Sequence, residues 1–149
     1  STQQTTDLTL AARQVQAVSY SVDDIKVNRV NDVVYYPGLP NFDTLSITFD
    51  NIYLKKTCSV LWNWFKTIYD PISGDMTKLA APGGPGNLAF KATKLRVVEL
   101  DNTRTPHAAM EFYGVYPRSV RFGEKNYSTG EFATIDVDFR FDFMDYFNY

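Results

Sequence analysis

Cysteine and histidine are nearly absent from this sequence, which holds one of each, Cys58 and His107. A single cysteine excludes an internal disulfide and a metal site made of cysteines alone, and a single histidine excludes a histidine-rich zinc site. A nucleophile pair of Cys58 and His107 is conceivable. Cys58, however, falls on the apolar arc of a predicted helix, where a thiol usually packs as a small hydrophobe. The scarcity of cysteine suits a reducing compartment.

The sequence also has no apolar run near the about 20 residues that a membrane-spanning helix needs, and no signal-peptide pattern. It opens with Ser1 rather than methionine, so we expect a processed protein or a piece of a longer one. The serine-hydrolase motif Gly-x-Ser-x-Gly is missing. The glycine-rich stretch 81–86 lacks the lysine and the preceding strand of a phosphate-binding or dinucleotide-binding loop. We therefore predict no catalytic residue, cofactor, metal or membrane partner.

The composition is that of one soluble globular domain, which we place at residues 1–149, with residues 1–7 frayed. Hydrophobic residues make up 44% and charged residues 21%, and a chain of this length can bury about 70% of its unfolded surface. Aromatic residues reach 15%, as in β-rich cores and interfaces. The net charge is −2, without the basic stripe that a nucleic-acid-binding protein normally shows.

The run Thr134–Phe143 has the clearest pattern in the sequence. Its apolar residues fall on one parity and its charged residues on the other. This alternation predicts a β-strand about 33 Å long, with one dry face and one wet, mostly acidic face. The dry face carries Ile135, Val137, Phe139, Phe141 and Phe143, and the wet face carries Asp136, Asp138, Arg140 and Asp142.

A calcium site formed by Asp136, Asp138 and Asp142 is a more specific hypothesis than a strand face exposed to solvent. No glycine-turned loop with a terminal glutamate accompanies these residues. Strand geometry also holds Asp136 and Asp138 roughly 7 Å apart. The solvated face is therefore the favoured interpretation. Paired carboxylates for glycoside chemistry are not marked out by any pattern.

Other segments predict further strands at residues 8–18, 19–27, 33–36, 45–49, 88–100 and 107–116. We expect Pro37–Asn41 to stop the third of these strands. Gly114 is expected to break the last strand and Pro117 to end it, with residues 118–122 continuing after a kink. The glycine- and proline-rich stretch 72–87 is expected to form a loop, and a loop of this length is either disordered or functional.

A helix is predicted from about Ile52 to Tyr69, with Asp50 or Asn51 as its amino-terminal cap. It ends before Asp70-Pro71, because the residue before a proline avoids helical geometry. The apolar arc of this helix is about 200° wide, whereas a surface helix needs only about 100° to cover its own core.

Two interpretations of this wide arc remain open. The helix either lies under a loop, or covers its own sheet with one flank and meets a second subunit with the other. Leu54, Cys58, Leu61, Trp62, Phe65, Ile68 and Tyr69 make up the larger, core-facing flank. On the second interpretation, Tyr53, Val60 and Trp64 form the subunit contact.

Three stretches, taken in order, resemble the tail-tube family of contractile-tailed bacteriophages, including the baseplate proteins that initiate the tube. The first is the strand Leu45–Phe49, followed by the helix with Leu61-Trp62-Asn63-Trp64-Phe65 and the turn Tyr69-Asp70-Pro71. The second is Thr105–Pro117, which is similar to the family's strand–Gly–x–x–Pro segment. The third is the ending Ala133–Phe141, which is similar to the family's closing strand. The resemblance extends from about Leu8 to Tyr146.

The resemblance implies a mainly β protein, an antiparallel β-sandwich or barrel with one flanking α-helix. It further implies a homo-hexameric ring with no catalytic residues, stacked on adjacent rings and contacting sheath or baseplate proteins. Such a subunit would belong to a virion tail assembled in the host cytoplasm, and genomic DNA would pass through its channel without specific binding. An acidic channel face would repel DNA within a Debye length of about 8 Å.

Within this framework the candidate channel-lining residues are Asp136, Asp138, Arg140 and Asp142. The loop 72–87 is expected to reach a neighbouring ring or the sheath. Two other classes were weighed against the tube subunit. One is a small β-barrel that binds a ligand among its aromatic residues, and the other is a hydrolase that uses aspartate or glutamate. Alternation along one strand does not supply the convergent carboxylates that the second class needs.

Overall fold

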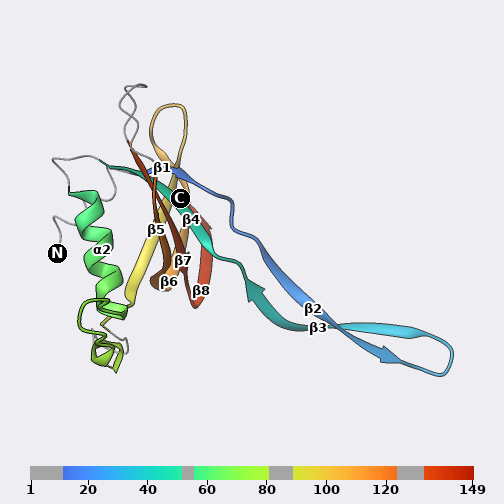
Figure 1. The fold of residues 1–149 in the computed structure, drawn as a ribbon. Helices are drawn as coiled ribbons and strands as arrows, with labels where there is room; N and C mark the ends of the chain where they lie inside the picture. The colour runs from blue at the N-terminus through green and yellow to red at the C-terminus, as the bar shows by residue number, and fades with distance from the viewer. Residues whose placement is uncertain (1–11, 52–55, 81–88, 124–132) are drawn as a thin grey trace.

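The computed structural model describes residues 12–51, 56–80, 89–123 and 133–149. They form a curled antiparallel sheet, one helix packed across it, and a two-stranded ribbon that projects away from the sheet (Figure 1). The predicted fold class, mainly β with one flanking helix, is confirmed, although the sheet is a half-barrel. The strands are β1 (Ala12–Val15), β2 (Tyr20–Asn28), β3 (Val33–Phe42), β4 (Leu45–Asp50), β5 (Ala92–Leu100), β6 (Pro106–Phe122), β7 (Thr134–Arg140) and β8 (Phe143–Asn148). The helices are α2 (Thr57–Ile68) and the short 3-10 helix η2 (Thr77–Ala80).

The main sheet has the strand order β1-β4-β7-β6-β5, and β8 pairs with the first half of β6. All of these pairings are antiparallel. β6 is 17 residues long, so its first half lies between β5 and β8 while its second half pairs with β7. Within the described part of the chain, the border strands β1 and β5 each have a partner on one side only, and so does β8. The sheet is therefore open.

The core lies on one face of the two central strands. Burial alternates strictly along β4 and β7, so that every second residue is buried. Cross-strand pairing places Leu45 opposite Phe139, Ile47 opposite Val137 and Phe49 opposite Ile135. Burying each such side chain contributes about 1.5–3 kcal/mol. The alternation predicted for residues 134–140 is confirmed.

Helix α2 covers this apolar face (Figure 1). Leu61 is fully buried in the core, and Trp64 packs on Phe139 with ring centroids 5.5 Å apart. The predicted cap at Asp50 or Asn51 is wrong for α2, whose cap residue is Lys56 in a left-handed conformation with no side-chain cap hydrogen bond. Residues 52–55 of the predicted helix lie outside the described part of the chain. The helix ends one residue before its predicted limit.

The carboxyl-terminal run is not a single ten-residue strand, which corrects the prediction for Thr134–Phe143. β7 ends at Arg140, and β8 begins at Phe143 beside the first half of β6. The break lies opposite Gly114, whose φ is +66°, and the Asp142 amide donates to the Tyr113 carbonyl (2.9 Å). β6 kinks here without ending, and Pro117 is buried inside the strand, so the expected stop at Pro117 is also wrong.

The projecting ribbon consists of β2 and β3, joined at Asn28–Val33. The predicted stop at Pro37–Asn41 is wrong, because β3 continues through this segment to Phe42. The segment instead causes a register shift between the Val22–Pro40 and Asp24–Pro37 pairs. The extra residue of this bulge lies at Gly38-Leu39. A Cβ on Gly38 would lie 2.8 Å from the Asp23 carbonyl oxygen, so only glycine allows this close approach of the two strands.

Candidate assembly surfaces

The face of β4 and β7 that points away from the core carries the predicted acidic residues in a hydrogen-bonded layer. Thr48 donates to Asp136 (2.8 Å) and Ser46 donates to Asp138 (2.6 Å). Ser119 on β6 donates to the second oxygen of Asp138 (2.9 Å). The Ser46 and Ser119 hydroxyls hold the pKa of Asp138 below its ordinary value. Asp136 and Asp138 therefore share one face, as predicted.

We call this face the polar face. It was expected to be mostly acidic, and that expectation is wrong because neighbouring strands add basic side chains to it. The cross-strand partner of Asp136 is Arg121 on β6. Asp138 also feels the charges of Arg121 and Arg118. Arg140 lies on β7 itself, two residues along from Asp138. The alternating aspartates of β7 predicted an acidic face, whereas the arginines that compensate them, Arg118 and Arg121, come from β6.

A further pair extends the charge balance to the sheet border. Arg13 on β1 lies 3.7 Å from Asp50 on β4. Both side chains keep contact with solvent, so the pair contributes little to stability. Its effect is to match another carboxylate with a guanidinium along the polar face.

Asp142 lies beyond the end of β7, in the break before β8. The Lys91 amine donates to both of its carboxylate oxygens at 2.9 Å. Arg140 and Asp142 both border the same open hollow, together with Tyr116. Asp142 thus lies in the break between β7 and β8, paired with a lysine, and not on a continuous strand face.

The predicted subunit-contact residues lie in different surroundings. Trp64 is half-buried, and its indole N–H donates to the Phe90 carbonyl (2.8 Å). Trp64 therefore packs against the core of its own chain, whereas it was predicted to lie on the flank of the helix that points outward. Val60 is half-buried on α2. Tyr53 lies outside the described residues, so the contact proposed for it stays a prediction.

The structure brings together one charged cluster that sequence reasoning missed. Glu111 on β6 is only 5% exposed, and it accepts from Tyr113 (2.5 Å), Lys94 (3.0 Å) and Arg96. The Tyr113 hydroxyl and the Lys94 amine are the largest causes that lower the pKa of Glu111 to about 2. Arg96 also lies over the Phe147 ring of β8 at 5.7 Å. The sequence feature that could have indicated this cluster is Glu111 itself, a charged residue within an otherwise apolar strand pattern.

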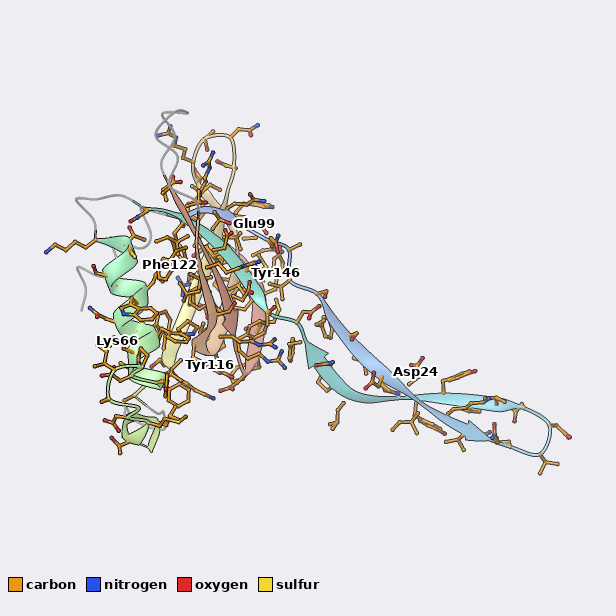
Figure 2. All side chains as sticks on the ribbon, viewed as in Figure 1. Asp24, Lys66, Glu99, Tyr116, Phe122 and Tyr146 are labelled. Atoms are coloured by element: carbon orange, nitrogen blue, oxygen red, sulfur yellow. The ribbon has the colours of Figure 1, made fainter. Side chains whose placement is uncertain are left out.

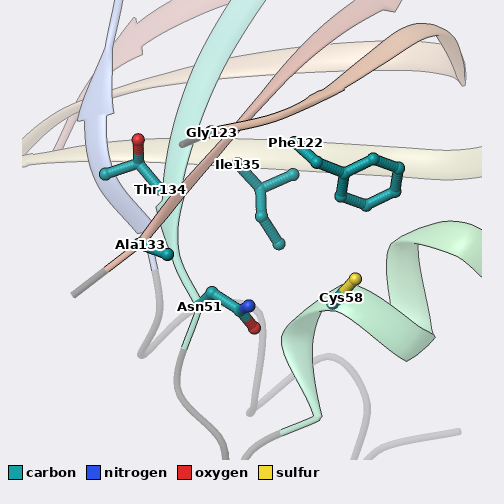
Figure 3. A pocket seen from close by; sticks show the side chains of 7 residues that line it. All are labelled: Asn51, Cys58, Phe122, Gly123, Ala133, Thr134 and Ile135. Atoms are coloured by element: carbon teal, nitrogen blue, oxygen red, sulfur yellow. The ribbon is translucent and has the colours of Figure 1, made fainter. Parts of the chain in front are cut away.

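A small hollow opens between the start of α2 and the ends of the central strands (Figure 3). Its volume is about 260 Å³, and Cys58, Phe122 and Ile135 point into it. None of the described residues that line it carries a carboxylate, an imidazole or an amine. Cys58 lines an apolar wall, as expected from the helix arc.

Two properties of the described residues bear on other classes of function. No group of three or more histidine, cysteine or acidic side chains in that part of the chain is arranged to hold a metal ion. No helix among the same residues combines the length and apolar character needed to cross a membrane.

No protein-family model and no curated protein matches this sequence. Solved structures do match its fold. The sheath/tube terminator of the extracellular contractile injection system PVC has a TM-score of 0.67 at 12% identity, covering 91% of this chain and 84% of that one. The chain has the tail-tube fold. A chain of the 6-fold symmetrised anti-feeding prophage baseplate has a TM-score of 0.65 at 8% identity, covering 92% and 80%.

The tail-tube fold is also shared with Hcp1 of E. coli EAEC 042, at a TM-score of 0.52 and 7% identity, over 90% of this chain and 70% of that one. These identities are low, so the likeness concerns the fold. The matched structures are a sheath/tube terminator of an extracellular contractile injection system, a prophage baseplate and an Hcp protein. The resemblance found in three sequence stretches thus has its counterpart in the fold.

Proposed function

We propose that this chain is a structural subunit of a contractile tail tube, in which six copies close into a ring. The open sheet carries the proposal. β1 and β5 are borders with unpaired backbone groups in the described structure, and such edges invite pairing with another chain. A ring of copies removes these edges, because the border of one subunit pairs with that of the next. A chain with the same fold belongs to a baseplate of sixfold symmetry, which supports six copies per ring.

The tube would serve a phage tail, with a possible place at the baseplate end where the tube starts. Its partners are adjacent rings, sheath or baseplate proteins, and its place is the tail of a virion assembled in the host cytoplasm. The described part of the loop 72–87 supports an outer contact, because Ile72 is 87% exposed and Met76 is 52% exposed. We propose that this loop meets a neighbouring ring or the sheath.

The polar face is the proposed channel lining, with Asp136, Asp138 and Arg140 pointing inward and Asp142 at the break between β7 and β8. Charge balance, and not net acidity, is then the property that lets genomic DNA pass without specific binding. Arg121 and Arg140 alone would attract phosphate, but each lies beside an aspartate. Paired charges at this spacing cancel beyond about one Debye length of 8 Å, so phosphate finds no uncompensated basic stripe.

The ring can be tested on the purified chain by negative-stain microscopy and light scattering, with amide hydrogen exchange on the same samples. We expect rings, and slower exchange in β1 and β5 on assembly because their outer edges become paired. Exchange in the interior strand β4 serves as the internal control, since it is paired on both sides before assembly. A chain that stays monomeric at high concentration, even with tube neighbours added, would contradict the proposal.

A further inference from the structure

The open hollow that Arg140 and Asp142 border has walls that are mostly aromatic and aliphatic. Its volume is about 630 Å³, within the range of about 300–1,000 Å³ of small-molecule sites. Figure 2 shows Tyr116 and Lys66 of α2 at the same end of the molecule. We call this space the aromatic hollow, and its uncharged walls are formed by Ile68, Leu79, Phe90, Tyr116 and Phe141.

The aromatic walls are fixed by contacts within the chain. The Phe90 and Tyr116 rings meet edge to face, with centroids 5.5 Å apart. The Phe90 carbonyl accepts the indole N–H of Trp64 (2.8 Å), which ties this segment to α2. Phe141 is only 5% exposed and packs on Phe112, with ring centroids 4.9 Å apart. The hollow is thus formed before any ligand enters, which lowers the entropy cost of binding.

Three charged residues border the aromatic hollow, and one of them has no counter-charge in contact. The Lys91 amine donates to both oxygens of Asp142 at 2.9 Å, so these two charges balance each other. Arg140 is half-buried, and no carboxylate among the described residues forms a salt bridge with it. The hollow therefore carries one surplus positive charge on a partly desolvated guanidinium, which favours an anion.

The chemistry of Arg140 and of its surroundings selects the kind of anion. A guanidinium presents a planar fork of donors that binds a carboxylate through two parallel hydrogen bonds. One negative charge balances the surplus, whereas a second one, as on a phosphate monoester, would be repelled by Asp142. The rings of Phe90 and Tyr116 can receive another ring at centroid distances of about 4.5–7 Å.

We propose that the aromatic hollow binds a monocarboxylate that carries an aromatic ring. The carboxylate pairs with Arg140, and the ring contacts Phe90 and Tyr116. Two sources share this chemistry, a free aromatic acid and a phenylalanine at the carboxyl terminus of another polypeptide. The site lies within one chain, so it does not depend on the ring proposed above.

A matched pair of small probes tests the need for the carboxylate. N-acetyl-L-phenylalanine, added to the nitrogen-15-labelled full chain at low salt, should bind with a Kd of about 1 mM. Its largest amide chemical-shift changes should lie at Lys91 and Tyr116. N-acetyl-L-phenylalaninamide keeps the ring but lacks the charge, so it should bind at least about tenfold more weakly. Equal binding of the amide, or tighter binding of deoxyadenosine monophosphate, would overturn the proposal.

Two arginine variants test the place of the site. Arg140→Gln should weaken binding of N-acetyl-L-phenylalanine about tenfold or more. Arg118→Gln removes the same charge from an exposed position of β6 that does not line the hollow, and it should weaken binding less than about twofold. Circular dichroism and the melting temperature verify that both variants fold. Equal losses in the two variants would mean diffuse attraction and would overturn the site.

The source of the ligand is distinguished by a pentapeptide that ends in phenylalanine with a free carboxylate. At least about tenfold tighter binding than that of N-acetyl-L-phenylalanine would assign the hollow to a polypeptide terminus. Equal affinity of the two probes would assign it to a free aromatic acid. The absence of saturable binding for both probes would overturn the inference and leave the proposed ring untouched.

Discussion

Gly114 shows how a single residue sets the geometry of two strands. Its φ of +66° is a conformation that other residues adopt only with strain. A Cβ at this position would lie 2.1 Å from an oxygen of Asp142. The kink of β6 and the break between β7 and β8 therefore face each other across the same point of the sheet.

The variant Gly114→Ala should destabilise the subunit for two separable reasons. The positive φ alone costs about 1–2 kcal/mol, and the clash with Asp142 adds about 1–3 kcal/mol. Gly74→Ala is the matched control, because Gly74 has a φ of +69° but open space around its Cβ position. Chemical denaturation of both variants measures the difference. Equal losses of unfolding free energy in the two variants would show that the clash is relieved without cost.

Glu111 makes the stability of the protein depend on pH in the acid range. Its pKa is lowered from the ordinary 4.5 to about 2 by Tyr113 and Lys94. A carboxylate with a lowered pKa adds stability that is fully present above its unfolded pKa and is lost as the pH falls through the folded one. The decline should therefore lie between about pH 4.5 and pH 2.

The variant Glu111→Gln should remove this part of the pH dependence. It should be less stable than the wild type at pH 7, because Lys94 and Arg96 lose a charged partner. The gap between the two proteins should then narrow steadily toward pH 2, where the wild-type carboxyl becomes protonated. Thermal melts across the acid range give the comparison, and a constant gap at every pH would contradict the assignment.

At the scale of elements, α2 is held to the sheet by side chains on one inner stripe. Leu61 is buried and Trp64 reaches both Phe139 and the Phe90 carbonyl. Trp62 lies on the outer side at 36% exposure, where it stacks on Phe65 and touches Phe122. Trp64 thus contributes to the core, whereas Trp62 lies at the surface.

The variants Trp64→Phe and Trp62→Phe should differ in how much stability they lose. Trp64→Phe leaves a half-buried carbonyl without its donor, at a cost of about 1–3 kcal/mol. Trp62→Phe keeps an aromatic ring at an exposed position and should change stability by no more than about 0.5 kcal/mol. Urea titrations followed by far-ultraviolet circular dichroism test the order. A larger loss for Trp62→Phe would place that residue in the core instead.

Sequence patterns predicted the elements well wherever one face of an element is buried. The alternation in residues 45–49 and 134–140 reported β4 and β7 correctly because burial there is one-sided. The same reasoning failed at Pro37–Asn41, since prolines are tolerated at the bulge of an exposed ribbon. It also placed Trp64 on an outer flank, because the true inner stripe runs through Thr57 and Leu61.

The charge of the polar face could not be predicted from one strand. Arg121 becomes the partner of Asp136 only through the register of β6 against β7, and a register is a property of the folded sheet. The Glu111 cluster was missed for the same reason, since Arg96 and Lys94 come from β5. Residue types were visible in the sequence, but their cross-strand neighbours were not.

At the scale of the whole molecule, the proposed channel lining can be tested by unbalancing its charges. Asp136→Asn/Asp138→Asn keeps acceptors for Thr48 and Ser46 while it removes two negative charges. Arg121 and Arg140 then face the channel uncompensated. Assembled tubes of this variant should retain short duplex DNA at low salt and release it as salt rises, whereas wild-type tubes should retain little.

A double charge change elsewhere provides the control for this prediction. Asp23→Asn/Asp24→Asn removes two carboxylates from the exposed strand β2, which projects away from the sheet (Figure 2). Tubes of this variant should behave like the wild type in the same filter-retention assay. Equal DNA retention by all three proteins would place the polar face outside the channel.

The pairing of β4 with β7 has a consequence for the order of events during synthesis. Ser46 and Asp138, bonded across this pair, are 92 positions apart along the chain. A ribosome must therefore release the chain beyond Asp138 before these two strands can meet. Non-local pairings of this kind fold slowly, over about milliseconds to seconds. The β2–β3 ribbon is consequently synthesised before the central strands can pair, and the proposed ring would assemble from folded chains rather than from nascent ones.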